Sequence, residues 1–339
     1  MLPVNQICHD QTHRDLRPGI RFDGRTGHRW LSITLLLFIL VSLTPLLMAC
    51  RSQSVVASGS AGYRFVDDLG QDVILPYRPE RVVALTGSFA ETWLLAGGKL
   101  AGVTSDAWSE RQMDLSPDVV DLGSLKEPNM ERILALSPGF VILSTEIDSH
   151  RKIDQRLTDL GIPHASFRVE HFSDYLNMLR ISTDLTGHKD LYQKNGLDVK
   201  TRVDAALADL QSERKPSVLL IRAFSTGVKV RKDDNMTGRM LAEFGCDNIA
   251  LHQNSLLDNL SIETIIDEDP DYILVETMGA DMGKALAALD KGLKASPAWS
   301  HLSAVRNQRF IVLPKDLFHY KPNAKWDEAY AYLAKIFNQ

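Results

Sequence analysis

The stretch PNMERILALSPGFVILS, residues 128–144, has a counterpart in LSIETIIDEDPDYILVE, residues 260–276. In both, a glutamate is followed by an isoleucine, a proline, an aromatic residue and an apolar run, which is typical of a helix, a break and a buried strand. Helix-proline-strand units are common in α/β proteins, so the match alone does not prove duplication. Because it includes Glu131 and Glu263, which no core requires, we interpret the repeat as two similar lobes.

The same alternation of strand and helix extends along the chain on both sides of these stretches. Strands are predicted at 81–85, 100–103, 140–144, 164–169, 217–224, 229–232 and 271–276, with helices at 89–98, 149–160 and 237–245. A hairpin around an Asp-Leu-Gly-Gln turn is predicted at residues 63–76. Strands that alternate with helices favour an α/β fold with parallel sheets, here two Rossmann-like lobes.

A segment from about Gly187 to Ser212 has apolar residues at helical spacing and mixed charges elsewhere. It predicts one long amphipathic helix that separates the lobes, although Gly196 weakens it. We therefore expect an N-terminal lobe at 63–186, a linking helix at 187–213 and a C-terminal lobe at 214–339. The last lobe ends in a helix, AYAYLAKIF, which we expect to pack on one lobe.

The N-terminal region contains an uncharged run at residues 31–49 that ends at Cys50. As a helix it would be about 28 Å long, near the hydrocarbon thickness of a bilayer, and arginines predominate upstream of it. Leu47-Met48-Ala49-Cys50 resembles the bacterial lipobox, in which the cysteine is lipidated and becomes the new N-terminus. We therefore expect a lipoprotein signal peptide at 1–49, an acylated (palmitate-bearing) Cys50 and a flexible tether at 50–62. An uncleaved signal anchor is the alternative.

Composition excludes several other classes of protein. The formal net charge is −5 and there is no stripe of Lys and Arg, so nucleic acid is not an expected partner. Three cysteines without ligand spacing predict neither a zinc site nor a disulfide framework.

Three further stretches carry a family resemblance: RPERVVALTGSFAETWLLAGGKLAGVT (78–104), EPNMERILALSPGFVIL (127–143) and GCDNIA (245–250). They resemble the solute-binding proteins of ABC importers for iron-siderophore, haem and cobalamin, the class with a helical backbone between its lobes. The resemblance covers about residues 63–320 and implies two α/β lobes joined by one long rigid helix, with a ligand cleft between the lobes. It implies a lipid-anchored receptor outside the cytoplasmic membrane that captures a metal chelate and delivers it to an ABC permease dimer with its ATPase subunits, with no cofactor and no catalytic residue of its own.

The resemblance also implies that Glu131 and Glu263 dock on arginines of the permease dimer. From the residues alone there is a structural alternative, because the dipole at a helix N-terminus favours a carboxylate in the first turn. Two exposed carboxylates at the same place on each lobe would suit a symmetric basic partner.

Ligands of open α/β sheets bind beyond the carboxyl ends of the strands, so the loops there are candidates for the binding site. Ser88 and Glu91 have the spacing of a capping box, whose helix N-terminus would offer N–H groups to an anionic ligand. Arg222 follows a strand and is suited to a bidentate contact with chelate oxygens. The full set of expected ligand-binding residues is Ser88, Phe89, Trp108, Thr145, Arg222, Phe224, Ser225, Met278, His319 and Tyr320.

Met278, His319 and Tyr320 include residue types that ligate haem iron. A lone Met is more often a packing residue, and a His-Tyr pair near the end of a chain more often makes local hydrogen bonds, so we expect no protein metal ligand. The cargo is expected to be a ferric chelate, haem or cobalamin.

Three other functions are compatible with parts of the sequence. An exported, lipid-anchored hydrolase would need a site without a known motif, because neither G-x-S-x-G nor H-E-x-x-H occurs. A zinc or manganese receptor would need clustered His and carboxylate ligands, whereas the ten histidines are scattered. An adhesive lipoprotein would not need a deep cleft.

Overall fold

The computed structural model describes residues 62–210, 215–253, 255–258, 261–279, 281–294 and 296–339. The expected signal peptide, Cys50 and nearly all of the expected tether lie outside these residues, and so does the end of the expected linking helix. Within the described ranges, every helix is too short or too polar to span a bilayer.

The N-terminal lobe is built on a parallel sheet with the strand order β5-β4-β3-β6-β7. Its strands are β3 (Val82–Ala84), β4 (Leu100–Val103), β5 (Val120–Asp121), β6 (Phe140–Ser144) and β7 (His164–Phe167). Alternate residues of β6 enter different clusters: Phe140 and Ile142 join one hydrophobic core, and Val141 and Leu143 join another. Both faces of the sheet are therefore buried, which is why its strands read as continuous apolar runs.

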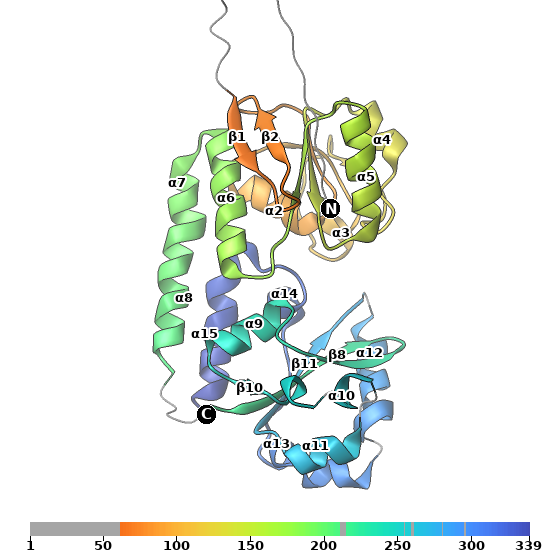
Figure 1. The fold of residues 1–339 in the computed structure, drawn as a ribbon, viewed down its shortest axis with the longest axis vertical. Helices are drawn as coiled ribbons and strands as arrows, with labels where there is room; N and C mark the ends of the chain where they lie inside the picture. Colours follow the sequence, from red (N-terminus) through yellow and green to blue (C-terminus); the bar gives the residue numbers. More distant parts are fainter. Residues whose placement is uncertain (1–61, 211–214, 254, 259–260, 280, 295) are drawn as a thin grey trace, which may run out of the picture. The chain divides into compact units, whose positions relative to one another are not determined.

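Helices cover both faces of this sheet (Figure 1). They are α2 (Gly87–Leu95), α3 (Asp106–Ser109), α4 (Met130–Ala135), α5 (Asp148–Asp159) and α6 (Phe172–Thr186). The sequence did not lead us to expect α6, a helix of 15 residues whose buried side includes Tyr175 and Leu179. It lies in the loop that the prediction left between the last strand of the lobe and the linking helix.

The predicted hairpin is present as β1 (Tyr63–Val66) and β2 (Asp72–Leu75), paired antiparallel. Phe65 stacks on Phe167 of β7 at 6.1 Å between ring centroids. The buried Asp67 carboxylate accepts the backbone N–H of Ser166 at 2.9 Å and also holds the hairpin turn. These contacts fix the hairpin against the β7 edge of the sheet.

The connection between the lobes is helical from Lys189 to Ala208. It consists of α7 (Lys189–Tyr192), a π-helical turn η2 (Gln193–Leu197) and α8 (Asp198–Ala208). Gly187 adopts the left-handed conformation (φ 80°) and ends α6, so the connection begins after it. Gly196 lies in the π turn, where a Cβ would come within 3.2 Å of Leu176 and Leu179. Close packing against α6 thus explains a glycine that helix propensity alone disfavours.

The C-terminal lobe has a second sheet, with the order β10-β8-β11-β12. Its strands are β8 (Ser217–Phe224), β9 (Gly227–Arg231), β10 (Asp247–Asn248), β11 (Tyr272–Thr277) and β12 (Phe310–Val312). β9 pairs antiparallel with β8 as a hairpin, which differs from the purely parallel arrangement that the alternation predicted. Only Ser225 and Thr226 separate β8 from β9, and such a short turn can join antiparallel strands but not parallel ones.

The helical segments of this lobe are short. They are α9 (Met236–Glu243), η3 (Ile249–Leu251), α10 (Ser255–Asp258), α11 (Ile262–Glu268), α12 (Met282–Leu289), η4 (Asp290–Lys294), η5 (Pro297–His301), α13 (Ser303–Arg306), α14 (Lys315–Phe318) and η6 (Asn323–Lys325). Leu219 and Ile273 enter a core specific to this lobe, whereas Leu220 and Leu274 join the large cluster that also contains residues of the N-terminal sheet.

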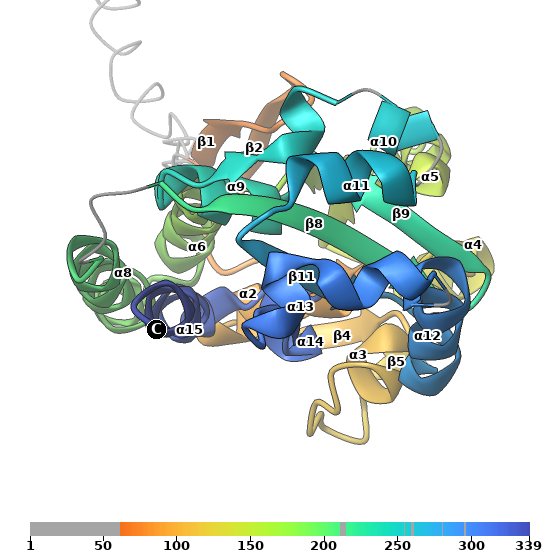
Figure 2. The same ribbon diagram turned by 90° about the horizontal axis from the view of Figure 1, so that it is seen from below.

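The C-terminal helix α15 (Trp326–Phe337) contacts both lobes. At its start, Trp326 packs on Phe172 of α6 at 5.6 Å between ring centroids. At its end, Phe337 packs edge-on against Tyr272 of β11 at 5.2 Å. It also lies beside α8, as Figures 1 and 2 both show. The helix therefore packs on the C-terminal lobe, as expected, and in addition contacts the N-terminal lobe, so the lobes are joined by α15 as well as by the linking helix.

Candidate ligand-binding cleft

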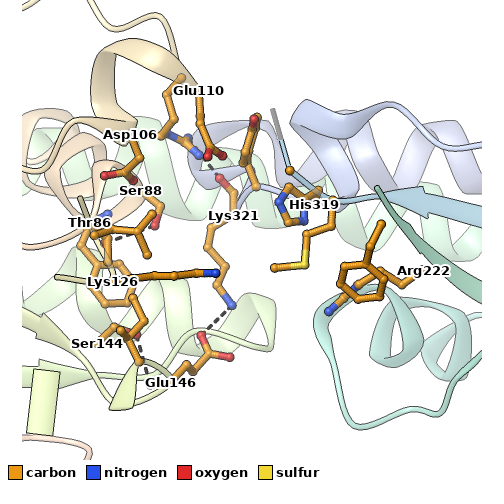
Figure 3. A pocket seen from close by; sticks show the side chains of 18 of the residues that line it. Thr86, Ser88, Asp106, Glu110, Lys126, Ser144, Glu146, Arg222, His319 and Lys321 are labelled. Atoms are coloured by element: carbon orange, nitrogen blue, oxygen red, sulfur yellow. Dashed lines mark hydrogen bonds and ion pairs between the residues drawn. The ribbon is translucent and has the colours of Figure 1, made fainter. Parts of the chain in front are cut away.

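A cavity of about 630 Å³ lies where the loops after the strands of both sheets meet. Loops following β3, β4 and β6 supply its N-terminal side, and loops following β8 and β11 supply its C-terminal side. This is the edge at which open parallel sheets bind ligands, and the volume is within the usual range for small-molecule sites. Figure 3 shows charged side chains from both sides pointing into it.

Eight of the ten expected ligand-binding residues line this cavity: Ser88, Phe89, Arg222, Phe224, Ser225, Met278, His319 and Tyr320. Trp108 and Thr145 are not among the described residues of the lining. Trp108 packs against the hydrophobic core, and Thr145 donates its backbone N–H to Phe167. A contact of the eight with a ligand stays a prediction.

The start of α2 differs from the capping box expected at Ser88 and Glu91. Thr86 is the N-cap, and its hydroxyl accepts the N–H of Phe89 at 3.3 Å. Asp106 accepts the N–H of Gly87 at 2.7 Å and the Thr104 hydroxyl at 2.6 Å. Burial raises the pKa of Asp106, and these hydrogen bonds oppose that shift. The helix N-terminus is thus already satisfied by the protein's own side chains and offers an anionic ligand less than the sequence suggested.

Glu91 forms an ion pair with Arg111 instead. Asn323 donates to the same carboxylate at 2.7 Å and to the carbonyl of Ser88 at 3.0 Å. Arg111 also donates to the carbonyl of Lys321 at 3.1 Å. The segment between α14 and α15 is thereby held on α2, which brings residues 319–321 into the cavity.

On the other side of the cavity, Arg222 is fixed by a buried carboxylate. Its Nε lies 2.7 Å from Oε2 of Glu276, whose side chain is 0% exposed on the adjacent strand β11. Oε1 of Glu276 has no hydrogen-bond partner among the described residues. Because Arg222 uses only Nε here, its terminal nitrogens remain for a ligand, and the ion pair sets the direction of the guanidinium.

His319 and Tyr320 are adjacent in the lining, with ring centroids 5.1 Å apart. Burial lowers the pKa of His319 to about 4, and three nearby positive charges act in the same direction. These charges belong to Lys315, Arg222 and Lys321. Burial and a hydrogen bond to Glu110 raise the pKa of Tyr320. At neutral pH the imidazole is therefore neutral, and the phenol stays protonated.

Several charged lining residues were not among the expected ones: Asp106, Glu110, Arg111, Lys126, Glu146 and Lys321. Lys321 pairs with Glu146 at 2.9 Å between Nζ and Oε2. Lys126 extends into the cavity in Figure 3, and in the described part of the chain its ammonium group has no ion-pair partner. The loop positions after the strands were visible in the sequence, but nothing there indicated that Lys126, five residues beyond β5, reaches the same cavity.

The described residues contain no group of three or more His, Cys, Asp or Glu side chains that could hold a metal ion. Cys246 is partly buried on the hydrophobic core, and burial raises the pKa of its thiol to about 12. It is therefore an unreactive packing residue.

The repeated stretches form the same structure in each lobe. Asn129 caps α4 by accepting the N–H of Arg132 at 3.0 Å, and Ser261 caps α11 by accepting that of Thr264 at 3.2 Å. Ser137 and Asp269, which follow these helices, both have positive φ, 46° and 37°. Each lies before a proline and a central strand, which supports the interpretation of two duplicated lobes.

Comparison with known proteins identifies the family. Residues 82–317 match the family model described as periplasmic binding protein. The chain belongs to this family. The expected resemblance is thus confirmed over most of residues 63–320.

Relatives and a solved structure agree with this assignment. YhfQ, a candidate ABC transporter substrate-binding lipoprotein of Bacillus subtilis (strain 168), is 26% identical over 81% of this chain and 88% of its own length. The Fe(3+)-citrate-binding protein YfmC of the same strain is 22% identical over 89% of this chain and 98% of its own. The structure of Staphylococcus aureus IsdE complexed with heme has a TM-score of 0.63 at 18% identity, covering 76% of this chain and 99% of the other. All three are named as proteins that bind a substrate or are complexed with one, and the structural likeness shows the two-lobe fold alone.

Proposed function

We propose that this protein is the substrate-binding component of an ABC importer and captures an iron chelate, either a ferric siderophore or haem, or a cobalamin-type ligand. The observation that carries the proposal is the cavity of about 630 Å³, to which the strand ends of both lobes contribute. Membership of the periplasmic binding protein family and the names of the relatives support it.

Binding is expected to involve the eight cavity residues named above, with Arg222 as the principal polar contact. A ligand between the lobes would favour the closed arrangement to the extent that it binds that arrangement more tightly. The segment from His319 to Lys321 leads from the C-terminal lobe toward the N-terminal lobe, where Asn323 is hydrogen-bonded to α2. We therefore expect closure to be small.

The protein is further proposed to be held on the outer side of the cytoplasmic membrane by lipid on Cys50, with Glu131 and Glu263 docking on a permease dimer. Both carboxylates are exposed, which suits recognition by basic side chains of a partner. The lipobox-like Leu47-Met48-Ala49-Cys50 supports the anchor. Labelling of the cells with a radioactive fatty acid should mark the parent protein and not a Cys50→Ala variant.

The test of the central proposal is a thermal-shift and calorimetric titration of the full-length chain in lipid nanodiscs. Ferric siderophores of several chemical types, haemin and cyanocobalamin would be added separately. Saturable binding of at least one of them at submicromolar concentration, with a concentration-dependent rise in Tm, is expected. Absence of binding across the whole panel by a folded protein would overturn the proposal.

A further inference from the structure

The charged groups in the cavity are separated by sign. Asp106 and Glu110 lie together on the side of α3, while Arg222 lies on the opposite side, with Lys126 and Lys321 between them (Figure 3). The charges that surround the neighbouring rings of His319 and Tyr320 show the same separation. All the charges that act on His319 are positive, whereas Glu110 and Asp106 are among those that act on Tyr320. A ligand in this cavity therefore meets a positive region next to His319.

The acidic side chains of the lining are already engaged. Asp106 accepts two hydrogen bonds from the protein, Glu110 lies close to the Tyr320 phenol, and Glu146 pairs with Lys321. The basic side chains are less fully used. Lys126 has no ion-pair partner in the described ranges, and Arg222 contributes only Nε to Glu276. The hydrogen-bonding capacity left for a ligand is therefore mainly that of cationic donors.

The apolar part of the lining is small. Of the described lining residues, hydrocarbon or thioether side chains come from Phe89, Leu125, Ile147, Phe224 and Met278. Phe89 is 2% exposed, so little of its ring faces the cavity. A macrocycle such as haem or a corrin requires a larger apolar surface, and an oxygen-rich chelate of similar volume requires less.

We infer that the cleft selects a ferric chelate whose outer oxygens carry net negative charge, with these oxygens against Arg222, Lys126 and Lys321. This inference rests on the proposed function and names the class of cargo. Charge-assisted hydrogen bonds to the anionic oxygens are stronger than neutral ones. A neutral or cationic chelate would desolvate Lys126 and give it no counter-charge.

The test uses two chelates with the same iron-binding core and opposite net charge. One is a ferric tris-hydroxamate with a pendant ammonium group, and the other is the same compound with that amine succinylated, which replaces the ammonium with a carboxylate. Ferric citrate, a ferric tris-catecholate and haemin complete the panel and separate the sources of negative charge. We expect the full-length protein to bind the carboxylate form at least about tenfold more tightly than the ammonium form, with the difference shrinking as salt is added.

Variants identify the residue responsible. Lys126→Gln should weaken binding of the carboxylate form about tenfold and change that of the ammonium form about twofold or less. Lys152→Gln, an exposed lysine of α5 outside the cavity lining, is the matched control and should change neither. Unaltered Tm values without ligand show that the variants are folded.

The outcomes separate this inference from the proposed function. Equal affinity for the two chelates, or an equal effect of Lys126→Gln on both, would overturn charge selection and leave the chelate receptor intact. Tighter binding of haemin than of any anionic chelate would also overturn it. If the protein bound no member of either panel, the inference and the proposed function would both fail.

Discussion

Glu131 and Glu263 occupy the same position in two equivalent helices. Each is the second residue of its helix, α4 or α11, and follows an N-cap whose side chain bonds the third backbone N–H. Both carboxylates are exposed. The hydrogen bond from Ser261 and the backbone lower the pKa of Glu263, so this group is ionised throughout the physiological range. An exposed charge repeated at one position in both lobes has no role in either core.

The first prediction concerns this pair. Glu131→Ala combined with Glu263→Ala should leave the affinity for the cargo unchanged and abolish uptake by cells, because the residues contact the permease and not the ligand. Uptake of radioactive iron chelate and calorimetry on the same variants measure the two effects. Each single substitution should lower uptake less than the double one.

A matched control is Glu127→Ala with Asp267→Ala, which removes one exposed carboxylate before α4 and one within α11, neither of them at the repeated position. This control should retain uptake. Loss of ligand binding in the Glu131 and Glu263 variant, or normal uptake by it, would contradict docking through these residues.

The second prediction concerns the ion pair between Arg222 and Glu276. Arg222→Ala should destabilise the protein by about 3–5 kcal/mol, because it leaves the fully buried Glu276 carboxylate without a counter-charge. Urea denaturation of the free protein measures this. Arg222→Gln combined with Glu276→Gln should restore most of the stability, since the charge is removed with its partner, and should still bind ligand poorly.

Comparing the stability of the single and double variants distinguishes a ligand contact of Arg222 from its ion pair with Glu276. If Arg222 only contacted ligand, the single substitution would weaken binding and leave the free energy of unfolding unchanged. If loss of the Arg222 charge did not destabilise the buried Glu276 carboxylate, the double variant would be no more stable than Arg222→Ala.

Much of the fold could be predicted because the relevant signals are local. Apolar runs such as FVILS and DYILVE predicted β6 and β11. The same order of glutamate, isoleucine, proline and aromatic residue after Glu131 and Glu263 indicated the repeat. The helix α6 was missed because its polar residues, among them Ser182 and Thr183, are buried and obscure the helical pattern. The position of α15 depends on contacts with both lobes, which no single stretch encodes.

The site was predictable in part for the same reason. Arg222 lies near the end of the clear strand β8 and Ser225 follows it, so the rule for open sheets located them. At α2, whether Thr86 or Ser88 is the N-cap depends on the residue at which the helix begins. Glu91 forms an ion pair with Arg111, which is 20 residues away in the sequence. Lys126 reaches the cavity from a loop without a sequence signal. Such pairings are tertiary and require the assembled fold.

The third prediction is a dependence of stability on pH. The pKa of His319 is about 4 in the folded protein and about 6.5 when unfolded. Between these values the unfolded chain binds a proton that the folded chain does not, so acidification from pH 6.5 to 4 destabilises the fold. The shift corresponds to about 3 kcal/mol at most, and the loss should level off below pH 4.

Because carboxylates titrate in the same range, the effect is measured as a difference between variants. The free energy of unfolding of His319→Gln should fall less than that of the parent from pH 7 to 4.5. His252→Gln, which replaces an exposed histidine next to Asp247, is the control and should follow the parent. Parallel profiles for His319→Gln and the parent would contradict a neutral buried imidazole.

The fourth prediction concerns Trp326, which is 0% exposed at the start of α15 and packs on Phe172. Trp326→Ala should destabilise the protein by about 3–5 kcal/mol through lost burial and a cavity. Trp326→Phe should cost much less, because the indole Nε1 has no hydrogen-bond partner among the described residues and a phenyl ring retains most of the contact. Since α15 contacts both lobes, the parent and Trp326→Phe should unfold in one transition by far-UV circular dichroism. If Trp326→Ala unfolded at the same urea concentration as the parent, the lobes would not depend on α15 for their stability.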